Sequence, residues 1–207
     1  RARQEALLHL CRTNGLRLIG PNALGVINTA SSSRLNASLA PTMPPAGRAG
    51  FFCQSGALGS AILETVTEQG LGLSTFVSAG NRADVSGNDL LQYWLEDDAT
   101  EVVLLYLESI GNPRKFSRIA RRGSETKPIV AVKSGRSTQG VPVGHAVRPS
   151  SAPLQAVDAM FRQAGVIQVD TLDEMFDVAQ ILAHQPLPRG NRIAVVGNSD
   201  AVALIVT

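Results

Sequence analysis

Aromatic residues and net charge are both scarce in this chain. Only 4% of its 207 residues are Phe, Trp or Tyr, and the formal net charge is +2 at pH 7. Proteins that bind nucleic acid need a concentrated basic surface, and those that bind single strands add aromatic side chains on which bases stack. Arg118, Arg121 and Arg122 form a short basic run without interleaved aromatics, which predicts one solvated face of a helix. We therefore expect no nucleic-acid partner.

Cysteines and long hydrophobic runs are scarce as well. Cys11 and Cys53 are the only cysteines, and their separation is not that of metal ligands. We therefore expect no metal site, and we expect the reduced, cytoplasmic setting in which most proteins lack disulfides. No apolar run approaches the roughly 20 residues that a membrane-spanning helix needs. The sequence also shows no signal peptide, so we expect no association with a membrane.

Several motifs that bind phosphate or activate a nucleophile are missing from the sequence. It contains no G-x-x-x-x-G-K-[ST] phosphate loop and no G-x-G-x-x-G dinucleotide loop. It also lacks the G-x-S-x-G turn that presents a hydrolase serine and the H-E-x-x-H helix of zinc peptidases. A phosphate site in this chain would have to be built from other elements.

What the sequence does contain is a regular alternation of apolar strands and helical patterns. Strands that are each followed by a helix are typical of a parallel sheet covered on both faces. The alternation predicts one doubly wound α/β domain over residues 46–186. We expect its strands at 50–54, 74–80, 101–109, 128–135 and 165–170, and its helices at 56–69, 87–98, 113–123, 153–164 and 171–184.

The segment before this domain is less regular. Helical spacing over 3–12 is followed by an apolar run at 16–20, which predicts a buried strand, and by the turn Pro21-Asn22. Residues 29–49 are rich in Ser, Ala and Pro and predict a linker. The sequence opens inside a helical pattern without a methionine and closes as a new strand begins, so we expect a piece of a longer protein.

Small polar residues follow four of the expected strands. In a doubly wound sheet, ligands bind at the carboxyl ends of the strands, and these ends meet at one edge. We therefore expect four groups of residues to lie together at that edge: Gln54-Ser55-Gly56, Ser78-Ala79-Gly80-Asn81, Glu108-Ser109-Ile110-Gly111 and Lys133-Ser134-Gly135-Arg136.

Ser55-Gly56 connects the expected strand at 50–54 to the expected helix at 56–69, and this connection has two interpretations. Ser55 is the residue type that caps a helix, and Gly56 lets the turn close. A helix N-terminus is also an anion site, and glycine lets a phosphate approach the backbone closely. Local spacing does not choose between the cap and the phosphate site.

Glu108 and His145 are the candidate catalytic side chains. A carboxylate directly after a buried strand costs free energy unless it is paired or at the sheet edge. Glu108 is therefore either a loop carboxylate that caps the next turn or a group that orients an imidazole. His145 lies in a loop rich in Gly, Pro and Ser, where an exposed residue without a role is the alternative.

Taken in order, five segments resemble the nucleoside-diphosphate-forming acyl-CoA synthetases, relatives of the succinyl-CoA synthetase alpha subunit. The resemblance covers nearly the whole chain. It is carried by "GLRLIGPNALGVIN", "FFCQSGALGSAILE", "VSAGNRADVSGNDLLQYWLEDDATEVVLLYLESIGNPRKF", "KPIVAVKSGRS" and "FRQAGVIQVDTLDEMFDVAQIL".

The resemblance implies a division into three parts. Residues 1–40 would be the C-terminal tail of a Rossmann-like CoA-binding domain plus a linker. Residues 46–186 would be the flavodoxin-like ligase domain with a doubly wound parallel sheet. Residues 188–207 would begin a second flavodoxin-like domain.

The resemblance also implies a chemistry. In the family, acyl phosphate phosphorylates a histidine, which passes the phosphate to a nucleotide; His145 in Gly144-His145-Ala146 matches that histidine and Glu108 its glutamate partner. Gln54, Ser55 and Gly56 match the helix N-terminus that cradles the phosphohistidine. The resemblance also implies that Pro21 and Asn22 contact coenzyme A.

The family's substrates and partners follow from the same resemblance. Coenzyme A, acyl-CoA, acyl phosphate and ATP or ADP with Mg are implied, the nucleotide through domains outside this chain. The remaining domains of the parent chain or an ATP-grasp subunit would complete the enzyme, and we expect a homo-oligomer. The alternative is a CoA-sensing regulatory region, without ligase chemistry, of a protein lysine acetyltransferase, which would bring protein lysine substrates.

Overall fold

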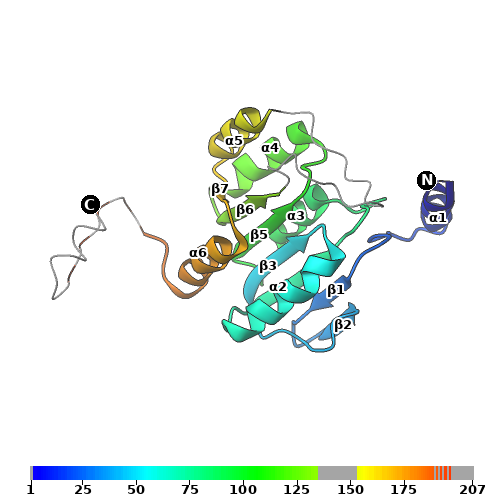
Figure 1. Cartoon of the computed structure of the whole chain (residues 1–207), viewed down its shortest axis with the longest axis horizontal. Coiled ribbons are helices and arrows are strands. Elements are labelled where there is room, and N and C mark those ends of the chain that lie inside the picture. The colour runs from blue at the N-terminus through cyan, green and yellow to red at the C-terminus, as the bar shows by residue number, and fades with distance from the viewer. Residues whose placement is uncertain are drawn as a thin grey trace.

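A single mixed sheet forms the centre of the molecule. The computed structural model describes residues 2–134 and 153–188, with the single positions 190, 192, 194 and 196. In these residues seven strands lie in the order β2-β1-β4-β3-β5-β6-β7 (Figure 1). The strands are β1 (Gly25–Asn28), β2 (Leu35–Ser38), β3 (Ala46–Cys53), β4 (Leu73–Ser78), β5 (Val102–Leu107), β6 (Ile129–Lys133) and β7 (Ile167–Val169).

The five strands from β3 to β7 are parallel to one another, whereas β1 is antiparallel to both of its neighbours, β2 and β4. β3 pairs in parallel with β4 and β5, and β6 pairs in parallel with β5 and β7. The connections carry helices, which parallel crossovers require. The helices are α1 (Ala2–Thr13), α2 (Gly56–Glu68), α3 (Gly87–Glu96), α4 (Pro113–Gly123), α5 (Leu154–Gln163) and α6 (Leu172–His184).

Helices cover both faces of the parallel part of this sheet, so β4, β5 and β6 are buried along almost their whole length. One face packs against α3, α4 and α5, where Trp94 is fully buried and the rings of Phe116 and Phe161 lie 5.5 Å apart. The other face packs against α2 and α6, where Phe51 contacts Phe76 and Phe176. The predicted flavodoxin-like doubly wound α/β fold is confirmed.

Helix α4 shows how local sequence defines these elements. It spans the predicted residues 113–123, with Pro113 at its first position and the Asn112 side chain accepting a hydrogen bond from the N–H of Lys115 at 3.0 Å. Its apolar residues Phe116 and Ile119 are buried. Arg118, Arg121 and Arg122 lie on its exposed face, as expected from the sequence.

Two expectations about the N-terminal region are wrong. Residues 16–20 form no strand; instead the carbonyls of Leu18 and Gly20 accept hydrogen bonds from the N–H groups of Val85 and Ala83. Residues 29–49 are not a linker, because they contain β2 and the start of β3. The parallel sheet predicted for residues 46–186 is confirmed over β3 to β7, and β1, which is antiparallel to both β2 and β4, extends the sheet beyond them.

The two strands that the sequence did not predict are short. β1 and β2 have four residues each, and β2 is exposed along most of its length, so neither has the long buried pattern of the parallel strands. Both strands come before residue 46 in the sequence, yet they belong to the same sheet as the later strands. The boundaries of the three domains remain predictions. The strand expected near the C-terminal end lies outside the segments that the structure describes.

None of the helices in the described residues is both long enough and apolar enough to span a bilayer.

Candidate functional site

Gln54 joins the carboxyl ends of β3 and β5. Its side-chain oxygen accepts hydrogen bonds from the N–H groups of Glu108 and Ser109, both at 2.9 Å. Its amide nitrogen donates to the carbonyl of Ser109 at 2.6 Å. Gln54 is only 4% exposed, so these three bonds form in a site shielded from water. The expectation that these strand ends share one edge is confirmed.

The ends of β4 and β6 reach the same two residues. Lys133 is 8% exposed, and its Nζ donates to the carbonyl of Glu108 at 2.8 Å. Arg82, in the loop between β4 and α3, donates to the carbonyl of Ser109 at 3.1 Å and to its Oγ at 2.7 Å. All four strand ends therefore meet around Glu108 and Ser109, although Gly135 and Arg136 of the fourth predicted group lie outside the described residues. Sequence reasoning singled out Lys133 but missed Arg82, because nothing in the local pattern shows which strand end its side chain reaches.

Ser55 caps helix α2. Its Oγ accepts a hydrogen bond from the N–H of Leu58 at 3.3 Å, and its backbone is extended, as a cap residue requires. The capping interpretation is therefore confirmed. Helix α2 begins at Gly56, two residues after the buried Gln54. Its N-terminus therefore lies at the sheet edge that holds Glu108. The phosphate-binding role of Gln54, Ser55 and Gly56 remains a prediction.

Pro21 and Asn22 lie at this edge too. The carbonyl of Pro21 accepts a hydrogen bond from the N–H of Asn81 at 2.9 Å. A Cβ placed on Gly80 would lie 2.0 Å from the oxygen of Asn22, and one on Gly56 would lie 3.9 Å from it. The turn therefore passes between the loop after β4 and the start of α2. The structure brings the residues expected to contact coenzyme A beside those expected to hold phosphate.

Glu108 is half-buried, and its charge influences two neighbours. Burial raises the pKa of the Cys53 thiol to about 12, and the nearby Glu108 carboxylate adds to this rise. Burial also raises the pKa of Tyr106, and Glu108 contributes there too. Cys53 is also fully buried, as structural rather than reactive cysteines are. The N-cap of α4 is Asn112, and both interpretations of Glu108 remain predictions.

His145 lies outside the described residues, so its pairing with Glu108 remains a prediction. Among the residues that the structure describes, no group of three His, Cys, Asp or Glu side chains could hold a metal ion.

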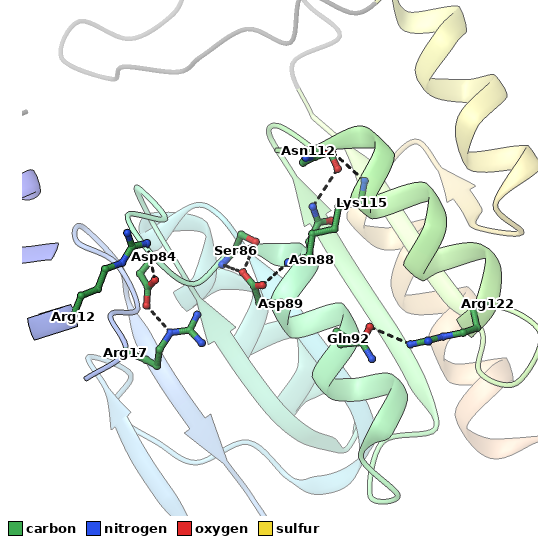
Figure 2. A network of polar contacts seen from close by, with 10 residues as sticks. All are labelled: Arg12, Arg17, Asp84, Ser86, Asn88, Asp89, Gln92, Asn112, Lys115 and Arg122. Carbon is green, nitrogen blue, oxygen red and sulfur yellow. Dashed lines mark hydrogen bonds and ion pairs between the residues drawn. The ribbon is translucent and has the colours of Figure 1, made fainter. Parts of the chain in front are cut away.

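Asp84 ties the N-terminal segment to the loop between β4 and α3. Its carboxylate accepts hydrogen bonds from Arg17 Nε at 2.7 Å, from the N–H of Leu18 at 3.1 Å and from an Arg12 guanidinium nitrogen at 3.2 Å. Figure 2 shows both arginines converging on this carboxylate, whose side chain is 8% exposed. The same loop carries Arg82, so Asp84 anchors the segment that reaches Ser109.

Asp84 should make stability depend on pH. The hydrogen bond from Arg17, followed by that from Leu18, lowers the pKa of Asp84 to about 2. A carboxylate whose folded pKa is depressed stabilises the protein fully above its unfolded pKa of about 4, and this contribution is lost as pH falls towards the folded value. We expect Asp84→Asn to lower the free energy of unfolding by about 1 kcal/mol at pH 7 and by less as the pH falls below about 4. Urea titrations from pH 7 to pH 3 would measure this.

The control for Asp84 is Asp98→Asn, the same change at an exposed position. An equal loss of stability at pH 7 in both variants, or an Asp84→Asn effect that is constant with pH, would contradict the expected role of the ion pairs.

The start of α3 is joined to α4 by a second set of polar contacts. Asp89 accepts hydrogen bonds from the N–H and Oγ of Ser86 at 3.0 and 2.6 Å, which forms a capping box. Lys115 pairs with Asp89 at 2.7 Å, and the Asn88 amide donates to the carbonyl of Asn112 at 3.2 Å (Figure 2). Asp89 therefore completes the N-terminal cap of α3 and joins α3 to α4.

Comparison with known proteins agrees with this architecture. Residues 46–182 match the family described as "Succinyl-CoA ligase like flavodoxin domain". The alpha subunit of ADP-forming acetate–CoA ligase I from Pyrococcus furiosus is 35% identical over 205 residues, which is 99% of this chain and 44% of that subunit. The ADP-forming 4-hydroxybutyrate–CoA ligase of Nitrosopumilus maritimus is 33% identical over 99% of this chain and 30% of its own length.

A solved structure shows the same fold. The dinucleotide forming acetyl-coenzyme A synthetase 1 of Ca. Korarchaeum cryptofilum, in complex with phosphate and ADP, has a TM-score of 0.88 and 32% identity, covering 97% of this chain and 44% of that one. This chain thus spans less than half the length of these relatives.

The fold and the strand-end site define a flavodoxin-like α/β domain of the succinyl-CoA ligase type. The chain belongs to the nucleoside-diphosphate-forming acyl-CoA synthetase family.

Proposed function

We propose that this chain is the phosphoryl-transfer part of an ADP-forming acyl-CoA synthetase that works through a phosphohistidine. The observation that carries the proposal is the meeting of strand ends around Glu108, where Gln54 binds the N–H groups of Glu108 and Ser109 beside the N-terminus of α2. Backbone N–H groups and the helix dipole at such an end favour a bound phosphate. The acidic side chain and the anion site then lie at the same edge.

The proposed chemistry has two phosphoryl transfers. Acyl-CoA and phosphate first give acyl phosphate and free coenzyme A. The imidazole of His145 then attacks the phosphorus, an N–P bond forms, and the P–O bond to the acyl group breaks to release the carboxylate. ADP takes the phosphoryl group from His145 and becomes ATP. A covalent intermediate divides one difficult transfer into two easier ones.

In this proposal each residue has a defined role. Glu108 accepts a hydrogen bond from one ring nitrogen of His145, which orients the neutral imidazole and stabilises the positive charge that develops on the ring as the other nitrogen attacks phosphorus. The N-terminus of α2 at Ser55 and Gly56 holds the phosphoryl group, and Gln54 fixes the backbone that carries Glu108. Pro21 and Asn22 contact coenzyme A.

The proposed partners lie mostly outside this chain. ATP or ADP with Mg binds other domains of the parent protein or an ATP-grasp subunit, and the assembled enzyme is a cytoplasmic homo-oligomer. The matching relatives are named as CoA ligases, which favours this function over the regulatory region of a lysine acetyltransferase.

Phosphorylation of the full-length parent protein tests the proposal. Incubation with labelled Mg-ATP should give phosphate on the protein that is acid-labile and base-stable, as phosphohistidine is. His145→Ala should abolish the label, and Glu108→Ala should reduce its rate of formation by about 100-fold or more. His184→Ala, at the exposed C-terminal end of α6, is the matched control and should leave the label unchanged.

The proposal fails if the folded, nucleotide-binding parent takes up no label, or if the label survives His145→Ala. The first result would make the regulatory region the leading account.

A further inference from the structure

Arg82 has a backbone conformation that ordinary side chains avoid. Its φ is +50°, in the left-handed region, and its N–H donates to the carbonyl of Ala79 at 3.0 Å, which closes a tight turn. This conformation costs a residue other than glycine about 1–2 kcal/mol. Such strain persists where surrounding contacts demand it, and it clusters at functional sites. The conformation therefore raises the question of what the Arg82 side chain is placed to do.

The guanidinium of Arg82 crosses from the loop after β4 to the end of β5. One nitrogen donates to the carbonyl of Ser109 at 3.1 Å and another to its Oγ at 2.7 Å. Paired donors in a planar fork fix the orientation of a partner as well as its distance. Arg82 thus holds both the backbone and the side chain of the residue that follows Glu108.

The support around Glu108 comes from three directions. Gln54 holds the N–H of Glu108 from β3, and Lys133 holds its carbonyl from β6. Gln54 also binds the N–H and the carbonyl of Ser109, whereas the side-chain hydroxyl of Ser109 is bound by Arg82. Arg82 acts on Ser109, where the chain leaves the sheet. Gly111 follows with a φ of +75°, a left-handed conformation that glycine adopts readily.

The loop that carries Arg82 is itself anchored. Two residues further on, Asp84 is bound by Arg12, Arg17 and the N–H of Leu18. The N–H of Ala83 also donates to the carbonyl of Gly20 at 2.9 Å. The Arg82 side chain is therefore built on a fixed base, which a positioning group requires.

We propose that Arg82 is a positioning residue, which locks Ser109 so that the Glu108 carboxylate is aimed at its imidazole partner. This inference rests on the proposed function, and it adds a residue from a different strand end to the site. Without the guanidinium, the turn after β5 gains freedom and the carboxylate loses its direction. A displacement of about 1 Å at a reacting group costs on the order of 100-fold in rate.

The test uses the full-length parent protein and two measurements. The first is the rate of phosphohistidine formation from labelled Mg-ATP as a function of nucleotide concentration. We expect Arg82→Ala to lower the maximal rate about 10- to 100-fold and to leave the half-saturating nucleotide concentration unchanged. Arg121→Ala, which removes an exposed arginine of α4, should change neither. A general loss of structure would not separate the two parameters in this way.

The second measurement is amide hydrogen exchange over residues 108–112, which reports on the turn whether or not the protein is phosphorylated. We expect exchange there to be at least about 10-fold faster in Arg82→Ala, while α6 is unaffected. Arg82→Asn serves as a second variant, because Asn tolerates the left-handed backbone and so removes the guanidinium with less strain on folding.

The outcomes distinguish the two proposals. Unchanged exchange at 108–112, or an unchanged maximal rate in both Arg82 variants, would overturn the role of Arg82 and leave the phosphohistidine intact. Faster exchange in the Arg82 variants, together with no phosphate label on the parent protein that keeps Arg82, would overturn the proposed function. It would also overturn any positioning of Glu108 for that reaction.

Discussion

Gln54→Leu is expected to slow phosphohistidine formation by about 100-fold or more and to destabilise the domain. Leucine has a similar volume but cannot replace the three hydrogen bonds that Gln54 makes to Glu108 and Ser109. The N–H groups of Glu108 and Ser109 would then lose their buried partner, at about 1 kcal/mol or more each, while the Ser109 carbonyl would keep its bond from Arg82. We therefore expect a loss of about 2 kcal/mol or more in the free energy of unfolding, measured by urea denaturation.

The matched control is Gln180→Leu, because this glutamine donates one exposed hydrogen bond, to the carbonyl of Gln69 at 2.8 Å. Its cost should stay within about 0.5 kcal/mol. Equal effects of the two variants on stability would show that Gln54 does not organise the end of β5. A normal phosphorylation rate in a destabilised Gln54→Leu protein would separate its structural role from the proposed reaction.

Gly80→Ala is expected to displace the turn at Pro21 and Asn22. The new Cβ would lie 2.0 Å from the backbone oxygen of Asn22 and 2.5 Å from that of Pro21, so the two loops would have to separate. Gly80 also has a φ of +49°, which alanine adopts only with strain. Strain and overpacking together should lower the free energy of unfolding by about 2–5 kcal/mol.

Binding of coenzyme A to the full-length parent would be measured alongside this stability. If Pro21 and Asn22 contact coenzyme A, affinity should fall at least about 10-fold in Gly80→Ala. Gly56→Ala is the control, because its Cβ would face the same turn at ordinary contact distance, 3.5 Å from the N of Leu24. Stability in that variant should change by less than about 1 kcal/mol. Full stability and affinity in Gly80→Ala would contradict the close approach of the two loops.

The sequence alone determined the parallel part of the fold. Strands buried on both faces must be apolar throughout, so "EVVLLYLES" and "PIVAVKSG" indicated β5 and β6 without further information. The first residues of the helices were equally clear. Ser and Asn are residue types that cap helices, and an apolar helical pattern follows Ser55 while a proline follows Asn112. Parallel connectivity then placed the strand ends at one edge.

Only the tertiary structure decided how that edge is built. Gln54 and its partners are 54 and 55 residues apart in the sequence, and Asp84 is separated by 66 to 72 residues from the groups that bind it. No local pattern encodes such pairs, because the hydrogen bonds exist only once strands from different parts of the chain are neighbours. The antiparallel strands β1 and β2 were missed for the same reason: their short, half-exposed segments are ordered by pairing with β4 and with each other.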